Sequence, residues 1–244
     1  MVRAIMDRAV ARSFQLLEAM AGAPDGARLS DLAAATGLQK STAHRIIGTL
    51  CALGYAEQIP SSRYRASLKA WELGAGVVAE LPIRRAAAGF LHGLQRATGE
   101  TVSLTILSGE DVVYLEKLVA PRPVKFRTRV GSRVPAPLTA SGKALLAART
   151  DAAEILDRLN ARRPIDIPAI LAELDEARRR GYALSGYSPG VTSIGAAVVT
   201  GGAPPTAALS ISAPSDRLAG GKREAAAEAL LEACARMAEA LDRP

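Results

Sequence analysis

The chain has 244 residues, of which 31 are Lys or Arg and 24 are Asp or Glu, so its formal net charge is +7. With 49% hydrophobic and 23% charged residues, the composition is typical of a globular protein and excludes a disordered one. No segment approaches the ~18 consecutive apolar residues that a membrane span needs, and charged residues interrupt the N-terminal stretch where a signal peptide needs an apolar run. We therefore expect a cytoplasmic protein of one large domain or two small ones, without membrane contact.

Cysteine and histidine are too few and too scattered to form the common metal sites. The chain has two cysteines, Cys51 and Cys234, and two histidines, His44 and His92, and it contains no CxxC pair. This pattern excludes a disulfide framework, a thiolate cluster and a multi-histidine centre. We predict no metal site and no cofactor.

The first 66 residues have the pattern of a winged helix-turn-helix domain. Apolar residues recur at helical spacing, turn residues separate the helical segments, and two short strand-like runs follow. Ser30 is suited to cap the second helix, and Gly37 ends it. The predicted elements in chain order are helix 3–21, turn 23–26, helix 30–36, helix 39–53, strand 55–59, turn 60–62 and strand 63–65.

The third predicted helix combines an apolar stripe with a polar face. The stripe consists of Ala43, Ile46, Ile47 and Leu50. The polar side chains near its start are small, as a helix in the DNA major groove requires, and each can bond to bases or phosphates. The tip of the following hairpin is polar and basic as well. We predict a DNA-binding surface made of Gln39, Lys40, Ser41, Thr42, His44, Arg45, Thr49, Ser62 and Arg63.

A helical stretch at 67–81, closed by Pro82, follows this domain, and we expect its Trp71 and Leu73 to serve in dimer or core packing. We assign 1–66 to the DNA-binding domain, 67–81 to a linker helix and 82–244 to a second domain. The second domain mixes helices with hairpin-connected strands, which predicts an α+β fold with an antiparallel sheet. Its expected helices are 83–98, 140–148, 151–160, 168–180 and 222–241, and its expected strands are 101–108, 111–118, 123–129, 182–186, 193–200 and 206–213.

A series of short motifs runs along nearly the whole chain. They are Leu29–Leu38, Lys40–Arg45, Leu53–Tyr55, Gly99–Val102, Val113–Glu116, Ser141–Leu146, Arg180–Tyr182, Pro189–Val191 and Ala208–Ser212. In this order they resemble the IclR-type bacterial transcriptional regulators. The resemblance implies a winged helix-turn-helix joined by a linker helix to a GAF-like mixed α/β effector domain. It further implies homodimers or homotetramers that bind pseudo-palindromic operator DNA, and a small organic acid effector that alters DNA binding or the recruitment of RNA polymerase.

The resemblance also implies where the polar end of an effector binds. Serine hydroxyls and free helix amides can hold a carboxylate without a buried charge on the protein. Alternate residues of a strand share one face, so two serines of the last strand can contact the same ligand. Carried over position by position, the implied effector contacts are Ala140, Ser141, Ser193, Ser210 and Ser212.

The chain departs from the family pattern at two places. Leu184-Ser185-Gly186 stands where many members carry a longer acidic run, and Ser193 replaces a common cysteine. The identity of the effector therefore does not carry over from the family. We expect an aromatic or short-chain carboxylate, with Ser185 and Tyr187 as additional contacts.

Two segments resemble enzyme motifs but lack groups that the corresponding chemistry needs. The segment 186–190 matches the GxSxG pattern of serine hydrolases, but Pro189 lacks the backbone N–H that the oxyanion hole needs, and both histidines precede Ser188. Gly142-Lys143 resembles a phosphate-loop fragment without its first glycine or its hydroxyl residue. We predict that the protein is not an enzyme.

The sequence thus predicts a ligand-responsive regulator that represses, or both represses and activates, a catabolic operon. The alternative is a small-molecule-sensing module that acts through protein partners and uses its helix-turn-helix for dimerisation. A basic run from Lys117 to Arg133 contains no acidic residue. It is either a solvated ribbon or a surface that binds anions or another subunit.

Overall fold

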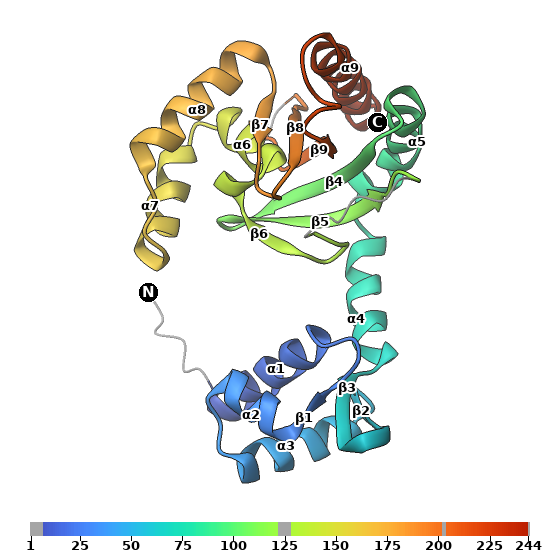
Figure 1. Ribbon diagram of the computed structural model, residues 1–244, viewed down its shortest axis with the longest axis vertical. Helices are drawn as coiled ribbons and strands as arrows, with labels where there is room; N and C mark the ends of the chain where they lie inside the picture. The colour runs from blue at the N-terminus through green and yellow to red at the C-terminus, as the bar shows by residue number, and fades with distance from the viewer. Residues whose placement is uncertain (1–6, 122–127, 202–203, 244) are drawn as a thin grey trace. The chain divides into compact units, whose positions relative to one another are not determined.

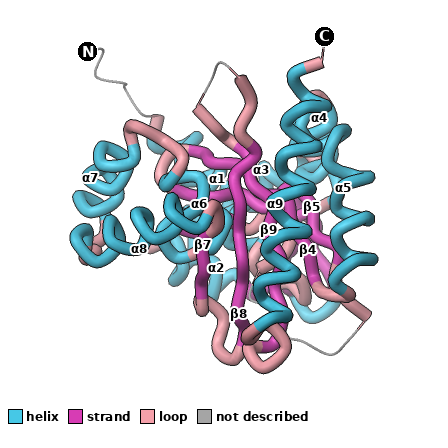
Figure 2. The backbone as a smooth tube through the Cα atoms, turned by 90° about the horizontal axis from the view of Figure 1, so that it is seen from above, coloured by secondary structure: helices cyan, strands magenta, loops and turns pink. Residues whose placement is uncertain are grey.

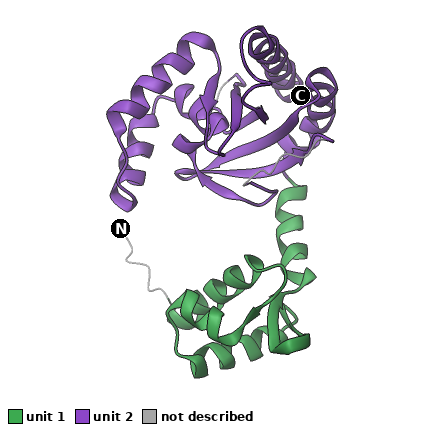
Figure 3. Ribbon diagram, viewed as in Figure 1, with its two compact units in different colours: residues 1–80 green, residues 81–244 purple. Residues whose placement is uncertain are grey.

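The computed structural model describes residues 7–121, 128–201 and 204–243. The chain forms two compact units, residues 1–80 and residues 81–244 (Figure 3). Each unit has its own hydrophobic core, so the two are described in turn.

Unit 1 is a winged helix-turn-helix, as predicted. Its strands form a small antiparallel sheet in the order β1-β3-β2 (Figure 1). The short strand β1 was not expected, because two residues give no alternation pattern to detect. The elements of unit 1 are α1 (Arg8–Ala21), β1 (Ala27–Arg28), α2 (Leu29–Thr36), α3 (Lys40–Ala52), β2 (Ala56–Ile59), a 3₁₀ turn (Pro60–Ser62), β3 (Arg63–Ala66) and α4 (Leu68–Ala79).

Two helix starts in unit 1 differ from the prediction. The N-cap of α2 is Arg28 and not Ser30, whose hydroxyl instead donates to the Asp31 carboxylate at 3.1 Å. Helix α1 begins at Arg8 after its N-cap, Asp7, whereas the prediction began it at residue 3, in a part of the chain that lies outside the described residues. Helix caps depend on local side-chain geometry, so periodicity alone does not fix them.

The turn between α2 and α3 depends on Gly37. This residue has φ 66° and closes α2 in the left-handed conformation, which a residue with a Cβ adopts only at a cost. The turn directs the predicted stripe of α3 into the core, where its four residues are buried with Leu16, Met20 and Leu32. The polar face of α3 is therefore left on the outside of unit 1.

The described residues of unit 2 form a six-stranded sheet in the order β6-β5-β4-β9-β8-β7, and each of the ladders between them is antiparallel. The predicted α+β class is therefore confirmed. The strands are β4 (Thr101–Ser108), β5 (Asp111–Leu118), β6 (Arg133–Pro135), β7 (Ala183–Ser185), β8 (Val191–Val198) and β9 (Ala207–Pro214).

One predicted strand of unit 2 needs correction. The prediction of a strand at 123–129 falls partly on 123–127, outside the described residues, and Thr128 and Arg129 belong to no strand. The edge strand that pairs with β5 is β6, which is only three residues long and carries Pro135 at its end. A run that short has too little alternation to be recognised in the sequence.

Helices cover both faces of the sheet. Helix α6 packs on β8 and β9 from one side, while α5 and α9, which lie side by side, cover the other side (Figure 2). Among the described residues, no helix is long and apolar enough to cross a membrane. The helices of unit 2 are α5 (Pro82–Thr98), α6 (Ala140–Ala147), α7 (Ala152–Arg162), α8 (Ile167–Arg180) and α9 (Gly221–Asp242).

The strand register separates hydroxyl side chains from apolar ones. Directly paired residues of neighbouring strands share a sheet face, and alternate residues of one strand take opposite faces. The paired residues Ser185, Ser193, Ser212 and Thr101 form one row across β7, β8, β9 and β4. The next row, one residue along, consists of Leu184, Ile194, Ile211, Val102 and Leu118. One face of the sheet is therefore lined with hydroxyl groups, and the other is apolar.

Candidate functional site

The polar face of α3 presents most of the predicted DNA contacts to solvent. Six of the nine predicted residues are exposed on α3 or at its start, and Ser62 is exposed at the tip of the wing. The guanidinium of Arg45 has no ion-pair or hydrogen-bond partner among the described side chains, so its donors are free for another molecule. The six are Gln39, Lys40, Ser41, His44, Arg45 and Thr49.

Two of the nine predicted contacts are half-buried, and two make side-chain hydrogen bonds within unit 1. Thr42 is half-buried, and the Thr49 hydroxyl donates to the carbonyl of Arg45 at 3.2 Å. Arg63 is also half-buried and donates to the Asp25 carbonyl at 3.4 Å. The Thr49 and Arg63 side chains thus bond within unit 1, which the sequence pattern did not distinguish from exposure to a ligand.

The seven predicted effector contacts all line one cavity in unit 2. The cavity has a volume of about 20 Å³ and lies between the start of α6, the loop after β7 and the hydroxyl face of β8 and β9. The predicted contacts that it brings together lie up to 72 positions apart, from Ala140 to Ser212. Its predicted lining residues are Ala140, Ser141, Ser185, Tyr187, Ser193, Ser210 and Ser212, and it is also lined by Tyr114, Thr128, Thr139, Ser188 and Val191.

The cavity is rich in hydroxyl groups, and none of the described residues that line it carries a carboxylate. The hydroxyls of Ser193 and Ser212 lie 2.8 Å apart and bond to each other. The Ser141 hydroxyl is buried and has no hydrogen-bond partner within the described chain. A buried polar group without a partner is costly, so this hydroxyl points to a ligand or solvent partner inside the cavity.

The start of α6 adds backbone donors to the cavity wall. The Thr139 side chain caps the helix by accepting from the Gly142 amide at 3.0 Å. The first amides of a helix have no acceptor within the helix, and the helix dipole favours an anion beside them. With Ala140 and Ser141 in the lining, this wall suits a carboxylate.

Gly195 allows α6 to lie this close to the sheet. A Cβ built at Gly195 would come within 2.4 Å of the Ala140 carbonyl carbon and of the Ser141 amide nitrogen. Gly195 pairs directly with Ser210, so the backbone of α6 rests on β8 right beside the serines of β9. A side chain at this position would push the helix start away from them.

Lys117 is a cation beside the cavity that sequence reasoning did not assign to it. Its ammonium group donates to the carbonyl and hydroxyl oxygens of Thr128, at 2.7 and 3.0 Å, and Thr128 lines the cavity. Burial lowers the pKa of Lys117 to about 8, so it stays mostly protonated at pH 7. The strand register places Lys117 on the same face of the sheet as the cavity serines, because Lys117 pairs with Ser103, which in turn pairs with Ser210.

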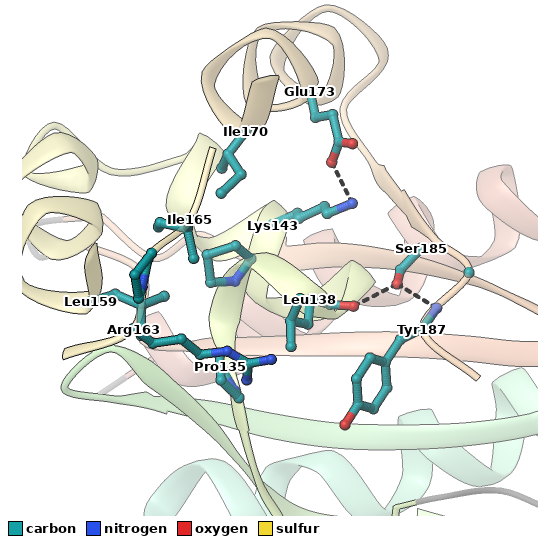
Figure 4. Close-up of a pocket in the computed structure, with 13 residues that line it drawn as sticks. Pro135, Leu138, Lys143, Leu159, Arg163, Ile165, Ile170, Glu173, Ser185 and Tyr187 are labelled. Atoms are coloured by element: carbon teal, nitrogen blue, oxygen red, sulfur yellow. Dashed lines mark hydrogen bonds and ion pairs between the residues drawn. The ribbon is translucent and has the colours of Figure 1, made fainter. Parts of the chain in front are cut away.

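A larger groove adjoins the cavity. It has a volume of about 520 Å³, and its walls combine polar side chains with apolar ones, Leu138, Ile165 and Ile170 among the latter (Figure 4). Lys143 forms an ion pair with Glu173 at one end, and Arg163 lies at the rim. Ser185 and Tyr187 line both the groove and the cavity.

Comparison with known proteins decides the family. The model for the IclR helix-turn-helix domain matches residues 9–60, and the model for the C-terminal domain of bacterial IclR transcriptional regulators matches residues 75–240. The chain belongs to the IclR family of bacterial transcriptional regulators. The resemblance predicted from the motifs is therefore confirmed.

Curated relatives of this IclR-family protein are regulators of transcription. It is 33% identical to the HTH-type transcriptional regulator XynR of Escherichia coli over 72% of this chain and 73% of the relative. It is 31% identical to the probable transcriptional regulator SauR of Cupriavidus necator over 86% of this chain and 87% of that relative. The family is one of regulators and not of enzymes, in agreement with the failure of the GxSxG pattern around Ser188.

Solved structures of the family have the same fold. An IclR homologue from Microbacterium hydrocarbonoxydans, complexed with 4-hydroxybenzoate, matches with a TM-score of 0.80 at 26% identity, covering 97% of this chain and 100% of the other. The Thermotoga maritima IclR matches with a TM-score of 0.75 at 25% identity, covering 96% of this chain and 98% of the other. The IclR fold thus extends over both units of this chain.

Proposed function

We propose that this IclR-family protein binds operator DNA through α3 and the wing, and that a small organic acid in the hydroxyl-lined cavity changes its DNA affinity. One observation supports the proposal that an acid binds. The seven predicted effector contacts all line one cavity, and that cavity contains a buried hydroxyl at Ser141 without a hydrogen-bond partner in the described chain. The proposal that the protein binds DNA rests on the exposed polar face of α3.

The chemistry of α3 supports DNA as the partner. A recognition helix needs short side chains that reach base edges and cations that neutralise phosphates. Ser41 and Gln39 are exposed near the start of α3, and Lys40 and Arg45 supply the positive charge. Of the other predicted contacts, Thr49 and Arg63 bond within unit 1 and hold the surface in shape, and Thr42 and Ser62 contact the DNA beside it.

The chemistry of the cavity supports a carboxylate. Hydroxyls and helix amides donate hydrogen bonds to an anion, none of the described lining residues is acidic, and Lys117 bonds to Thr128 of the lining. An anion can alter DNA binding only if it binds more tightly to one arrangement of the protein than to the other. That an IclR homologue has been crystallised with 4-hydroxybenzoate supports an organic acid as the ligand class.

A second copy of the chain is the natural partner for α4. This helix exposes large apolar side chains, with Trp71 67% and Leu68 74% exposed, and exposed apolar surface of this kind favours association. We propose a homodimer or homotetramer that acts on cytoplasmic DNA as a repressor or dual regulator, with α4 setting the spacing of the two recognition helices. RNA polymerase is a further proposed partner.

The variant Arg45→Ala tests the DNA-binding surface. If Arg45 reads a base, its loss weakens binding to the operator by about 1–3 kcal/mol and relaxes specificity. If it contacts phosphate, binding to every sequence weakens equally and the salt dependence becomes shallower. We expect one of these two patterns when the affinity for DNA upstream of the protein's own gene is measured by gel shift across sequences and salt concentrations.

Arg96→Ala is the matched control, because it removes the same charge from an exposed position on α5 of unit 2. It should leave DNA affinity unchanged. Equal affinities for the native protein and Arg45→Ala at every salt concentration would contradict the assignment of α3. They would favour the alternative in which the helix-turn-helix only dimerises.

A further inference from the structure

The cavity and the groove of unit 2 share a wall. Ser185 and Tyr187 line both spaces. On one side lies a hydroxyl-lined space of about 20 Å³, and on the other a space of about 520 Å³ whose walls include the apolar side chains of Leu138, Ile165 and Ile170. The close-up in Figure 4 shows Tyr187 at the edge of the groove, beyond Ser185. The two spaces differ in chemistry as well as in size.

The wall is held by defined hydrogen bonds. The Ser185 hydroxyl donates to the Leu138 carbonyl at 2.7 Å and accepts from the Tyr187 amide at 3.1 Å. The hydroxyl hydrogen of Ser185 is thus used in the bond to Leu138, so this residue fixes the wall and does not donate to a ligand. The Tyr187 side chain is half-buried against the apolar cluster of unit 2, which includes Tyr114.

The volume of the cavity limits what it can hold. A space of about 20 Å³ accommodates on the order of one water molecule, whereas a cavity of about 150 Å³ is enough for benzene. An acid of two or three carbons already requires the serine side chains to move apart. An aromatic acid needs the space that the Tyr187 side chain occupies.

We propose that Tyr187 acts as a size filter for the effector, so that the native protein takes a short-chain hydroxy or oxo acid and rejects acids that carry an aromatic ring. This inference rests on the proposed binding of an acid in the cavity. The hydroxyls of Ser193, Ser210 and Ser212 then bond to the hydroxyl or oxo group of the acid, while the start of α6 holds its carboxylate. Removal of the Tyr187 ring joins the cavity to the groove, where Leu138, Ile165 and Ile170 provide an apolar site for a ring.

The test compares glycolate, a two-carbon hydroxy acid, with benzoate. We expect calorimetric titration of the full-length native protein to detect glycolate and not benzoate. Tyr187→Ala should gain affinity for benzoate by about tenfold or more, the range over which a pocket discriminates by size. Adding Ile170→Trp to Tyr187→Ala narrows the groove and should reduce the gain.

Three further variants make the test decisive. Tyr187→Phe keeps the ring and should reject benzoate as the native protein does. Tyr182→Ala, a tyrosine that lines neither space, should also behave like the native protein. Tyr187→Val removes the ring with less loss of bulk and replaces the alanine variant if that one does not fold.

The outcomes separate this inference from the proposed function. Native protein that binds benzoate as tightly as glycolate overturns the filter but leaves acid binding intact. A folded Tyr187→Ala or Tyr187→Val that binds glycolate and still rejects benzoate overturns the filter as well. If neither the native protein nor any variant binds either acid, the proposed acid site fails together with its filter.

Discussion

Gly195→Ala is expected to lower the free energy of unfolding of unit 2 by about 3 kcal/mol and to abolish acid binding. The added Cβ would lie within 2.4 Å of the Ala140 carbonyl carbon and the Ser141 amide nitrogen. These are backbone atoms, so no side-chain rotation relieves the overlap, and overpacking of this kind costs ~1–3 kcal/mol or more. The start of α6 must move away from β8, and its amides then no longer face the serines of β9.

Urea denaturation and calorimetric titration with glycolate measure the two effects of Gly195→Ala. The matched control is Gly93→Ala on α5, where an added Cβ would meet no atom within 4 Å. Because glycine is unfavourable within a helix, this change should stabilise the protein by up to about 1 kcal/mol. A Gly195→Ala protein with native stability and native acid affinity would contradict the close contact between α6 and β8.

Ile47→Ala is expected to lower the free energy of unfolding of unit 1 by about 2–5 kcal/mol. Ile47 lies on α3, is fully buried and packs in the core with Leu16, Met20 and Leu32. The side chain anchors the inner face of the helix whose outer face carries Arg45, so loss of packing there also reduces DNA affinity. The effect combines the lost burial of three methyl or methylene groups with the cavity left behind.

Hydrogen–deuterium exchange of the full-length protein localises this effect. Faster exchange in Ile47→Ala should be confined to peptides of α1 to α4, with those of β4 to β9 unchanged. Ile47→Val removes a single methylene and should cost only about 0.5–1.5 kcal/mol. Equal destabilisation by the two variants, or faster exchange spread over both units, would contradict a separate core behind α3.

Elements with many residues and a clear period were predictable from the sequence. The stripe of α3 repeats at helical spacing over more than two turns, so both its helix and its buried face could be derived. The strands β4 and β9 are eight residues long and were placed within about one residue. The two- and three-residue strands β1 and β6 carry no such pattern, because they form through pairing with β3 and β5.

The candidate cavity was predictable only in part. Motifs pointed to Ser193, Ser210 and Ser212, but the sequence does not state that Ser193 lies opposite Ser212 or that Gly195 lets α6 approach. Such contacts depend on strand register, which a linear pattern does not reveal. Lys117 was noticed only as part of a basic run for the same reason.

The role of Ser185 also depended on tertiary contacts. The sequence placed it where family members carry acidic residues and made it a direct ligand contact. In the structure Ser185 lines the cavity, and its hydroxyl bonds to Leu138, 47 positions away, and to the neighbouring Tyr187 amide. We therefore propose it as a wall residue, whose effect on a ligand is exerted through Tyr187.

The central claim is that an acid in unit 2 controls how tightly unit 1 holds DNA. Fluorescence anisotropy of the full-length protein, titrated onto labelled DNA from upstream of its own gene with and without short-chain and aromatic acids, tests it most directly. We predict salt-dependent binding whose affinity changes by about 5- to 150-fold when the effective acid is present. Failure to bind these fragments at low ionic strength, or an affinity that no acid alters, would contradict the account.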